Sequence, residues 1–225
     1  MLAMTLALAG CIFETDIDDA KAAYQNGDYA TAFNLFKPLA EQGNADAQFN
    51  LGLMYQYGEG VIEDDKEAVR WYRHAADQGH ADAQHNLGAM YQFGEGVTED
   101  DKEAVRWYRM AADQGYAKAQ NNLGLMYQFG EGVIEDKKEA VRWYRKAADQ
   151  GYAYAQYNLG WMYQHGEGVL QDNKKAHMWL NIARSNGNDK ADDNIEILTQ
   201  YMTPADISKA QDMARQCLAY NYQDC

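Results

Sequence analysis

The chain has little of several residue types on which common enzymatic functions depend. Its only two serines, Ser185 and Ser208, lie near the C-terminus and neither begins an S-x-x-K motif. Nucleophilic catalysis needs an activated hydroxyl or thiol beside a base, so we do not expect a serine enzyme. No H-x-x-x-H pair, Walker loop or dinucleotide-type glycine motif is present. We therefore predict no catalytic residues, no cofactor and no metal site.

Proline and positive charge are also scarce. Only two prolines occur among 225 residues, and the abundant Ala, Leu, Met, Gln, Glu and Lys favour helices over strands. Twenty basic residues stand against 34 acidic ones, which gives a formal net charge of -14. This surplus of negative charge repels a phosphate backbone, and no basic stretch reverses it locally. Nucleic acid is therefore not an expected partner.

The apolar run over residues 1–13 is too short to cross a bilayer, which takes roughly 20 helical residues. Within it, Leu8-Ala9-Gly10-Cys11 resembles the bacterial lipobox, and the resemblance implies a lipoprotein signal peptide over residues 1–11 with lipidation of Cys11. Ile12 follows the cysteine, and by resemblance to lipoprotein sorting this implies an outer-membrane anchor in the periplasm instead of retention in the inner membrane. The run departs from the pattern because no Lys or Arg precedes it. The alternative is a buried N-terminal helix cap with a free Cys11. A cytoplasmic assembly or signalling adaptor is then the alternative function.

Glycine and tryptophan recur every 36 residues along the chain. The two series are Gly43, Gly79, Gly115 and Gly151, and Trp71, Trp107, Trp143 and Trp179. A period of this length indicates a solenoid, because one unit cannot bury its own apolar face and stacked units can. We predict four repeats at 44–79, 80–115, 116–151 and 152–187. A degenerate repeat at 16–43 precedes them and a helical cap at 188–225 follows.

Each repeat is predicted to contain two helices. In the second repeat, the GEGV segment supplies Gly94 as a helix stop, and Asp100 supplies an N-cap for the second helix. Gly88 lies in the middle of the first helix, where glycine costs about 1 kcal/mol relative to alanine. We expect it to admit a close partner helix through residues equivalent to Ala75 and Ala76.

Two further features concern the ends of the repeat array. Pro38 lies where the second helix of the degenerate repeat should run, so we expect a kink or an early end there. Thr203 and Pro204 are predicted to start the last helix, which should extend to about Tyr220.

The pattern A-x-x-x-L-G-x-M-Y-x-x-G-x-G-V, followed by A-x-x-W-x-x-x-A, resembles the Sel1-like repeats of the tetratricopeptide superfamily over residues 16–187. The resemblance implies an all-α fold, a right-handed superhelical α/α solenoid of 36-residue helix-turn-helix repeats whose first helices line the concave side. It also implies a non-catalytic scaffold for a protein or peptide partner. We expect a monomer that touches a membrane only through the lipid on Cys11.

Most differences between the repeats fall on one face of the first helix. Three varied positions are polar, namely Asp46, Asp82 and Lys118. For these three, solvent exposure explains the variation as well as partner binding does. The candidate partner-binding residues on this face are Phe49, Leu53, Tyr57, His85, Phe93, Asn121, Leu125, Phe129, Tyr154, Tyr157, Trp161 and His165, with the recurring Asn86, Asn122 and Asn158 beside them. The alternative for some of the aromatic residues, especially Tyr57, Phe93 and Phe129, is that they pack between successive repeats instead of contacting a partner. Each recurring Asn can pair with the backbone of an extended peptide or, equally, with the neighbouring repeat.

Cys217 and Cys225 form an even pair, and an oxidising envelope would favour a disulfide between them. Their C-x7-C spacing resembles the bridge within each repeat of secreted cysteine-rich Sel1-like proteins, some of which bind or hydrolyse β-lactams. This chain lacks such a pair in every repeat, so β-lactam binding or hydrolysis is the weaker alternative to a binding scaffold.

Overall fold

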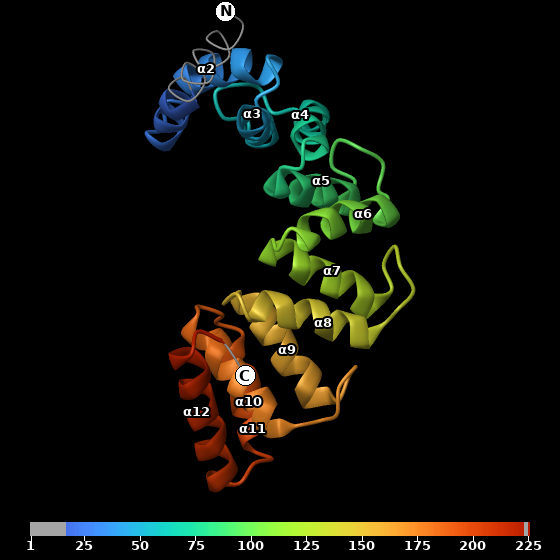
Figure 1. Cartoon of the computed structure of the whole chain (residues 1–225), viewed down its shortest axis with the longest axis vertical. Coiled ribbons are helices and arrows are strands. Elements are labelled where there is room, and N and C mark those ends of the chain that lie inside the picture. The colour runs from blue at the N-terminus through green and yellow to red at the C-terminus, as the bar shows by residue number, and fades with distance from the viewer. Residues whose placement is uncertain (1–16, 223–224) are drawn as a thin grey trace, which may run out of the picture. The chain divides into compact units, whose positions relative to one another are not determined.

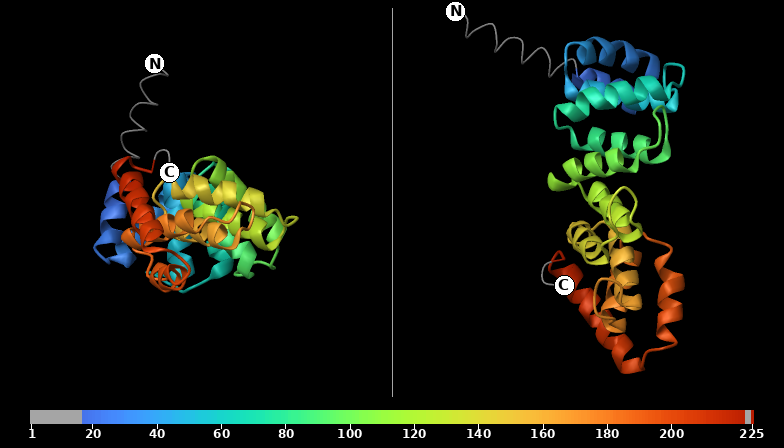
Figure 2. Two further views of the ribbon diagram at one scale, coloured as in Figure 1. Left: turned by 90° about the horizontal axis from the view of Figure 1, so that it is seen from below. Right: turned by 90° about the vertical axis from the view of Figure 1, so that its right-hand side faces the viewer.

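The computed structural model describes residues 17–222 and Cys225, and these residues form helices without strands. Residues 17–25 are helical, and the labelled helices are α2 (Tyr29–Glu41), α3 (Ala45–Tyr57), α4 (Asp65–Asp77), α5 (Ala81–Phe93), α6 (Asp101–Asp113), α7 (Ala117–Phe129), α8 (Lys137–Ala148), α9 (Ala153–His165), α10 (Asn173–Ser185), α11 (Ala191–Thr199) and α12 (Pro204–Ala219) (Figure 1). The chain divides into two compact units, Met1–Ala111 and Ala112–Cys225. Within each unit, consecutive helices pack side by side (Figure 2). The predicted fold class, an all-α helical repeat solenoid, is confirmed.

The predicted helix stops are present in every repeat. Gly58, Gly94, Gly130 and Gly166 adopt left-handed backbone conformations directly after α3, α5, α7 and α9. Asp136 accepts hydrogen bonds from the backbone N–H groups of Lys138 and Glu139 and so caps α8. The Glu139 carboxylate pairs with Arg142 at 2.9 Å.

The second glycine of the GEGV segment has a role that the sequence did not indicate. Gly168 has a φ of +67°, and a Cβ added there would lie 2.2 Å from the carbonyl oxygen of Lys137. The loop after α9 therefore packs directly on the first turn of α8. Gly96 lies in the same way against Asp65 in the first unit.

The prediction that alanines contact the mid-helix glycines was wrong. A Cβ at Gly124 would lie 2.6 Å from the Tyr144 ring, and a Cβ at Gly52 would lie 2.6 Å from the Tyr72 ring. The glycine thus makes room for a flat aromatic ring of the second helix in its own repeat, and not for alanines such as Ala75 or Ala76. In the fourth repeat, Leu180 replaces the tyrosine.

The expected early end at Pro38 was also wrong, because α2 continues to Glu41. Proline disrupts the hydrogen bond and packing toward the preceding turn, but its carbonyl still accepts a hydrogen bond from the Gln42 N–H at 3.1 Å. The last turn of the helix therefore closes normally. At the other end of the array, Thr203 caps α12 and Pro204 begins it, as predicted.

A ladder of buried amides runs through the repeats. Gln120 donates to the carbonyl of Ala112 at 3.1 Å and accepts from Gln150 at 2.7 Å. Gln48 and Gln156 occupy the same position in the first and fourth repeats. Each buried amide is therefore hydrogen-bonded, as burial of a polar group requires.

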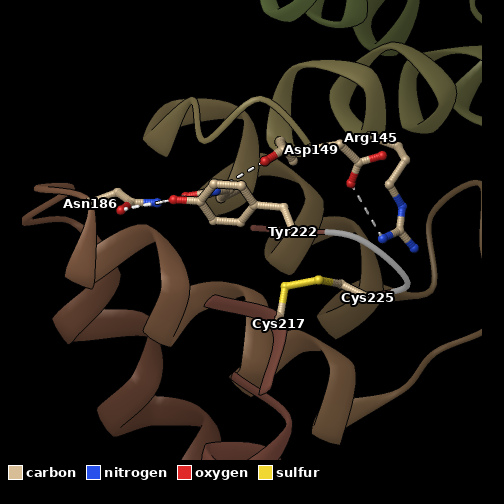
Figure 3. The surroundings of a disulfide bond; sticks show 8 residues. Arg145, Asp149, Asn186, Cys217, Tyr222 and Cys225 are labelled. Carbon is tan, nitrogen blue, oxygen red and sulfur yellow. Dashed lines mark hydrogen bonds and ion pairs between the residues drawn. A yellow bond between two sulfur atoms is a disulfide. The ribbon is translucent and has the colours of Figure 1, made fainter. Parts of the chain in front are cut away.

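The C-terminal tail closes this ladder. Asn186 stands where the earlier repeats have glutamine, and its amide contacts both Gln156 and the Tyr222 hydroxyl (Figure 3). The structure joins Cys217 to Cys225 in a disulfide, with the two Cα atoms 5.4 Å apart. The tail is thereby held against the last repeat.

A second recurring hydrogen bond joins the two helices of a repeat. Tyr144 donates its hydroxyl proton to Gln128 Oε1 at 2.6 Å, and Tyr72 donates to Gln56 at 2.6 Å. Burial raises the pKa of both tyrosines, so their hydroxyls remain protonated donors. In the fourth repeat Leu180 supplies no hydroxyl, and Gln164 Oε1 is buried without a partner.

We predict that Tyr144→Phe will lower the free energy of unfolding by about 1–3 kcal/mol, because it leaves Gln128 Oε1 without its donor. Urea denaturation followed by circular dichroism measures this change. Tyr154→Phe is the matched control, since Tyr154 is 57% exposed. Equal stability of the two variants would show that the buried hydrogen bond contributes nothing.

His177 on α10 is a buried histidine whose charged form is disfavoured in the folded second unit. Its side chain is 1% exposed, and its pKa lies below the usual value because burial disfavours the charged form, with a smaller effect from Arg184. The unfolded chain therefore binds more protons than the folded chain below the ordinary histidine pKa of about 6.5. Stability is complete above that pH and declines as the pH falls through the lowered pKa of the folded state.

We accordingly predict that the urea midpoint falls between pH 7 and pH 5, and that His177→Gln flattens this dependence. His74→Gln is the control, because His74 is exposed on α4. A pH profile that both variants leave unchanged would exclude His177 as its source.

Candidate functional site

A solvent-open concavity of about 300 Å³ lies on the second unit between α7 and α9. Its lining is Leu125, Gln128, Phe129, Tyr157, Asn158 and Trp161. Five of these six residues were predicted from the sequence as partner-binding residues, and Gln128 was not. The varied face of these two first helices is therefore gathered around one hollow.

Two of the three aromatic side chains that line the concavity, Trp161 and Tyr157, are held by neighbouring residues. The His165 ring stacks on Trp161 with 4.1 Å between ring centroids, and its Nδ1 lies 2.9 Å from the Trp161 carbonyl oxygen. The Tyr157 hydroxyl accepts a hydrogen bond from Asn194 of α11 at 3.1 Å. Phe129 stands at the rim and is 61% exposed.

Two amides complete the lining. Gln128 is 8% exposed, and its Oε1 accepts from Tyr144. Asn158 donates to Asn121 Oδ1 at 2.9 Å. Among the described residues, no group bonds Gln128 Nε2 or Asn158 Oδ1, so the concavity offers one donor and one acceptor. For Asn158, the interpretation of a contact to the neighbouring repeat is correct.

The prediction that Asn121 is available to a partner was wrong. Its side chain is only 4% exposed, because its amide pairs with Asn158 between α7 and α9 and also donates to Asn122 at 3.4 Å. Asn121 therefore positions Asn158 instead of reaching a ligand. The sequence showed an amide on each helix but not that the two would meet.

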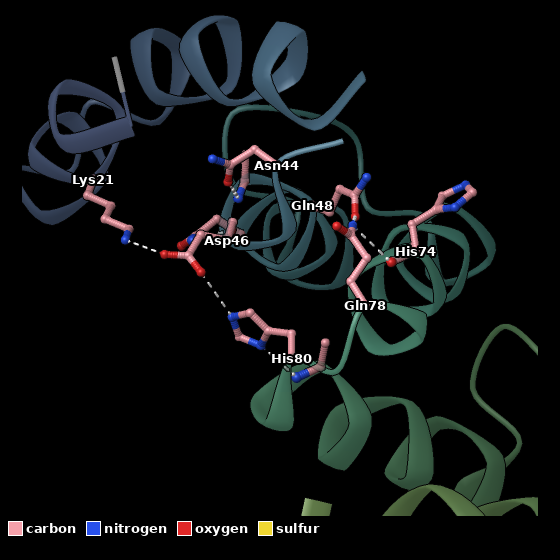
Figure 4. Close-up of polar contacts among 10 residues, drawn as sticks. Lys21, Asn44, Asp46, Gln48, His74, Gln78 and His80 are labelled. Carbon is pink, nitrogen blue, oxygen red and sulfur yellow. Dashed lines mark hydrogen bonds and ion pairs between the residues drawn. The ribbon is translucent and has the colours of Figure 1, made fainter. Parts of the chain in front are cut away.

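In the first unit, the varied face of the first helices serves mainly for packing. Phe49 stacks on His80 with 4.7 Å between ring centroids, and Leu53 packs against the core around α4. Asp46 joins Lys21 at 2.6 Å and lies 3.5 Å from His80 (Figure 4). These residues are largely engaged within the unit, whereas Tyr157 and Trp161 on α9 line the concavity.

The remaining predicted residues lie at separate places. The His85 ring contacts Tyr108 and its Nδ1 lies 3.1 Å from Asn86. Tyr57 and Phe93 are 62% and 66% exposed at the ends of α3 and α5, so their alternative role in packing between repeats is not what the structure shows. Tyr154 projects from the start of α9 and is 57% exposed.

Two kinds of site are missing from the part of the chain that the structure describes. No group of three or more His, Cys, Asp or Glu side chains is arranged to hold a metal ion there. None of the helices described combines the length and the hydropathy needed to cross a bilayer. Cys11, the candidate for lipidation, lies outside the described residues.

A sequence model of the Sel1 repeat matches the chain at residues 20–44, 45–80, 81–116, 117–152 and 153–188. No curated protein sequence matches. A solved protective antigen of uropathogenic Escherichia coli with an SLR fold is 33% identical over 97% of this chain, with a TM-score of 0.80, and this chain spans about half (48%) of its length.

Two further solved structures are similar. A Sel1 repeat protein from Oxalobacter formigenes is 36% identical over 83% of this chain and 75% of its own, with a TM-score of 0.73. An immunity protein from Pseudomonas aeruginosa shares the fold at 22% identity over 91% of this chain and 81% of its own, with a TM-score of 0.54. The recurring helix pairs and these matches together show that the chain belongs to the family of Sel1-repeat proteins.

Proposed function

We propose that this protein is a non-catalytic adaptor that holds a short, extended peptide segment of a partner protein in the concavity between α7 and α9. The observation that carries the proposal is the cluster of Phe129, Tyr157 and Trp161 around a solvent-open hollow. Exposed aromatic clusters mark interaction surfaces, and Sel1 repeats typically mediate protein–protein interactions.

The lining indicates which kind of segment fits. None of the six lining residues carries a charge. An apolar side chain of the partner can therefore enter the concavity without burying a charged group of this protein. Burial of one such side chain contributes about 1.5–3 kcal/mol. Gln128 Nε2 can donate to a backbone carbonyl of the segment, and Asn158 Oδ1 can accept from a backbone N–H.

The fixed positions of the rings also favour binding. Ordering side chains at an interface costs about 0.5–1.5 kcal/mol for each flexible side chain. Tyr157 is already held by Asn194, and Trp161 is already stacked with His165. This cost is therefore largely met in the free protein.

Site-specific photocrosslinking tests the proposal. A benzophenone amino acid replaces Phe129 at the rim, which leaves Trp161 and Tyr157 intact, and the control carries it at Arg142, whose side chain is 75% exposed on α8. We expect one dominant adduct from position 129, with the crosslink mapped by mass spectrometry to an apolar segment. Equal adducts from both positions would contradict the proposal.

We further propose that the protein works in the bacterial cell envelope, held by a lipid on Cys11. The similarity of Leu8-Ala9-Gly10-Cys11 to the lipobox supports this location. Labelling of cells with radioactive palmitate should mark the wild-type protein and not Cys11→Ala. An unlabelled, soluble wild-type product would remove the lipid anchor on Cys11 without affecting the concavity.

A further inference from the structure

The first unit exposes three large apolar side chains at or beside the loops that join its helices. Tyr57 ends α3, Ile62 follows in the loop before α4, and Phe93 ends α5. These three side chains are 62%, 87% and 66% exposed. Large apolar side chains gathered on one exposed surface usually mark a contact with another molecule.

The two loops form one continuous surface. A Cβ added at Gly96 would lie 2.3 Å from the carbonyl oxygen of Asp65, the first residue of α4. The loop after α5 is therefore packed against the point where the loop after α3 ends. We call residues 57–67 and 93–103 together the acidic edge.

The charge of the acidic edge is strongly one-sided. Each of its two segments contains five carboxylates and a single lysine. Glu67 and Glu103 pair with Arg70 and Arg106 on their own helices. Glu63, Glu95 and Glu99 are exposed and have no ion pair with any residue that the structure describes.

The second unit repeats the apolar pattern without this charge. Ile134 and Leu170 are each 91% exposed at the equivalent loop position. Residues 129–139 contain four carboxylates and two lysines, and residues 165–175 contain two of each. Lys137 pairs with Glu135 and Glu167 there. The loops of the second unit therefore serve as a control for the acidic edge, because they keep exposed aliphatic residues but have only a small surplus of negative charge.

We propose that the acidic edge binds a basic amphipathic segment of a partner protein. Apolar side chains of that segment cover Tyr57, Ile62 and Phe93, while its Lys or Arg residues approach Glu63, Glu95 and Glu99. Complementary charge speeds the encounter and rejects partners of the wrong sign. An anionic bilayer, a nucleic acid and a second copy of this chain are all negatively charged, so the acidic edge repels them.

This surface is distinct from the concavity between α7 and α9, and neither proposal rests on the other. The two differ in partner chemistry, because the concavity has an uncharged lining and the acidic edge requires positive charge. Failure of one binding test therefore leaves the other intact.

The test uses the full chain and a fluorescent amphipathic peptide of about 18 residues built from Leu and Lys. Fluorescence anisotropy at near-physiological salt measures its affinity. We expect a triple variant, Tyr57→Ser with Ile62→Ser and Phe93→Ser, to bind at least about tenfold more weakly. The matched variant Ile134→Ser with Leu170→Ser should change the affinity by less than about twofold. Circular dichroism checks that both variants remain folded.

A second pair of measurements separates the contribution of charge. Glu63→Gln with Glu95→Gln and Glu99→Gln should weaken binding and reduce its salt dependence, and a peptide with Glu in place of Lys should not bind. Any of three results would overturn the proposal: an unchanged affinity of the triple serine variant, equal losses in the two units, or equally tight binding of a Lys peptide without Leu. Tighter association with phosphatidylglycerol vesicles than with the peptide would likewise overturn it.

Discussion

Replacing Gly168 with alanine will lower the free energy of unfolding by roughly 3 kcal/mol, the largest loss that we expect from removing or adding a single methyl group. Two costs combine at this position. Its φ of +67° is left-handed, which costs a residue with a Cβ about 1–2 kcal/mol. The new Cβ would also lie 2.2 Å from the Lys137 carbonyl oxygen, and overpacking of this kind costs about 1–3 kcal/mol.

Gly187→Ala is the matched control for this prediction. Its φ is +90°, but an added Cβ there would meet nothing within 4 Å, so only the backbone cost of about 1–2 kcal/mol applies. Urea denaturation of both variants gives the difference. Equal losses would mean that the contact between the GEGV loop and the first turn of α8 does not help to hold the repeats together.

Removing the two rings at the centre of the concavity should abolish most of the partner affinity. Trp161→Ala combined with Tyr157→Ala is expected to weaken capture of the crosslinked segment by at least about 100-fold, since buried aromatic anchors often contribute 2 kcal/mol or more each. Binding of a synthetic peptide with the crosslinked sequence, measured by calorimetry, gives the change. Far-ultraviolet circular dichroism should remain that of the wild type.

Tyr220→Ala controls for the loss of an exposed aromatic side chain in the same unit. Tyr220 is 71% exposed and follows α12, away from the lining residues. Its substitution should leave the affinity unchanged. If the double variant still captures the segment as well as the wild type, the concavity is not the binding site.

The helices and their ends could be predicted because local chemistry determines them. Gly94 ends α5 by adopting a conformation that side chains disfavour, and Asp136 caps α8 with its own carboxylate. Neither effect depends on how the helices cross. Because these signals recur every 36 residues, the sequence predicts a helix pair as the repeating unit of the fold.

The partner of the mid-helix glycines could not be predicted in the same way. Tyr72 and Ala75 lie one turn apart on the same helix, so both are near Gly52 in any antiparallel pairing. The angle at which α3 and α4 cross decides which of them meets the glycine. A single sequence shows that a close approach exists but does not give that angle.

The candidate site was predicted only in part for a related reason. Phe49 and Trp161 lie at neighbouring turns of the same varied face in their respective repeats, yet His80 from the next repeat covers the Phe49 ring. Whether a varied residue is open to solvent thus depends on the particular residue that the adjacent repeat brings to it. Variation between the repeats does not indicate Gln128, because a glutamine recurs at this position in every repeat as part of the M-Y-Q sequence.

Trp161 reports directly on whether a partner segment occupies the concavity. Of the five tryptophans, Trp71, Trp107, Trp143 and Trp179 are at most 6% exposed, and Trp161 is the one that is partly exposed. Acrylamide should therefore quench one component of the fluorescence in the free protein, and that component should be absent from Trp161→Phe. We predict that adding the captured peptide protects this component from quenching. Unchanged quenching of Trp161 with the peptide bound would show that the segment does not occupy the concavity.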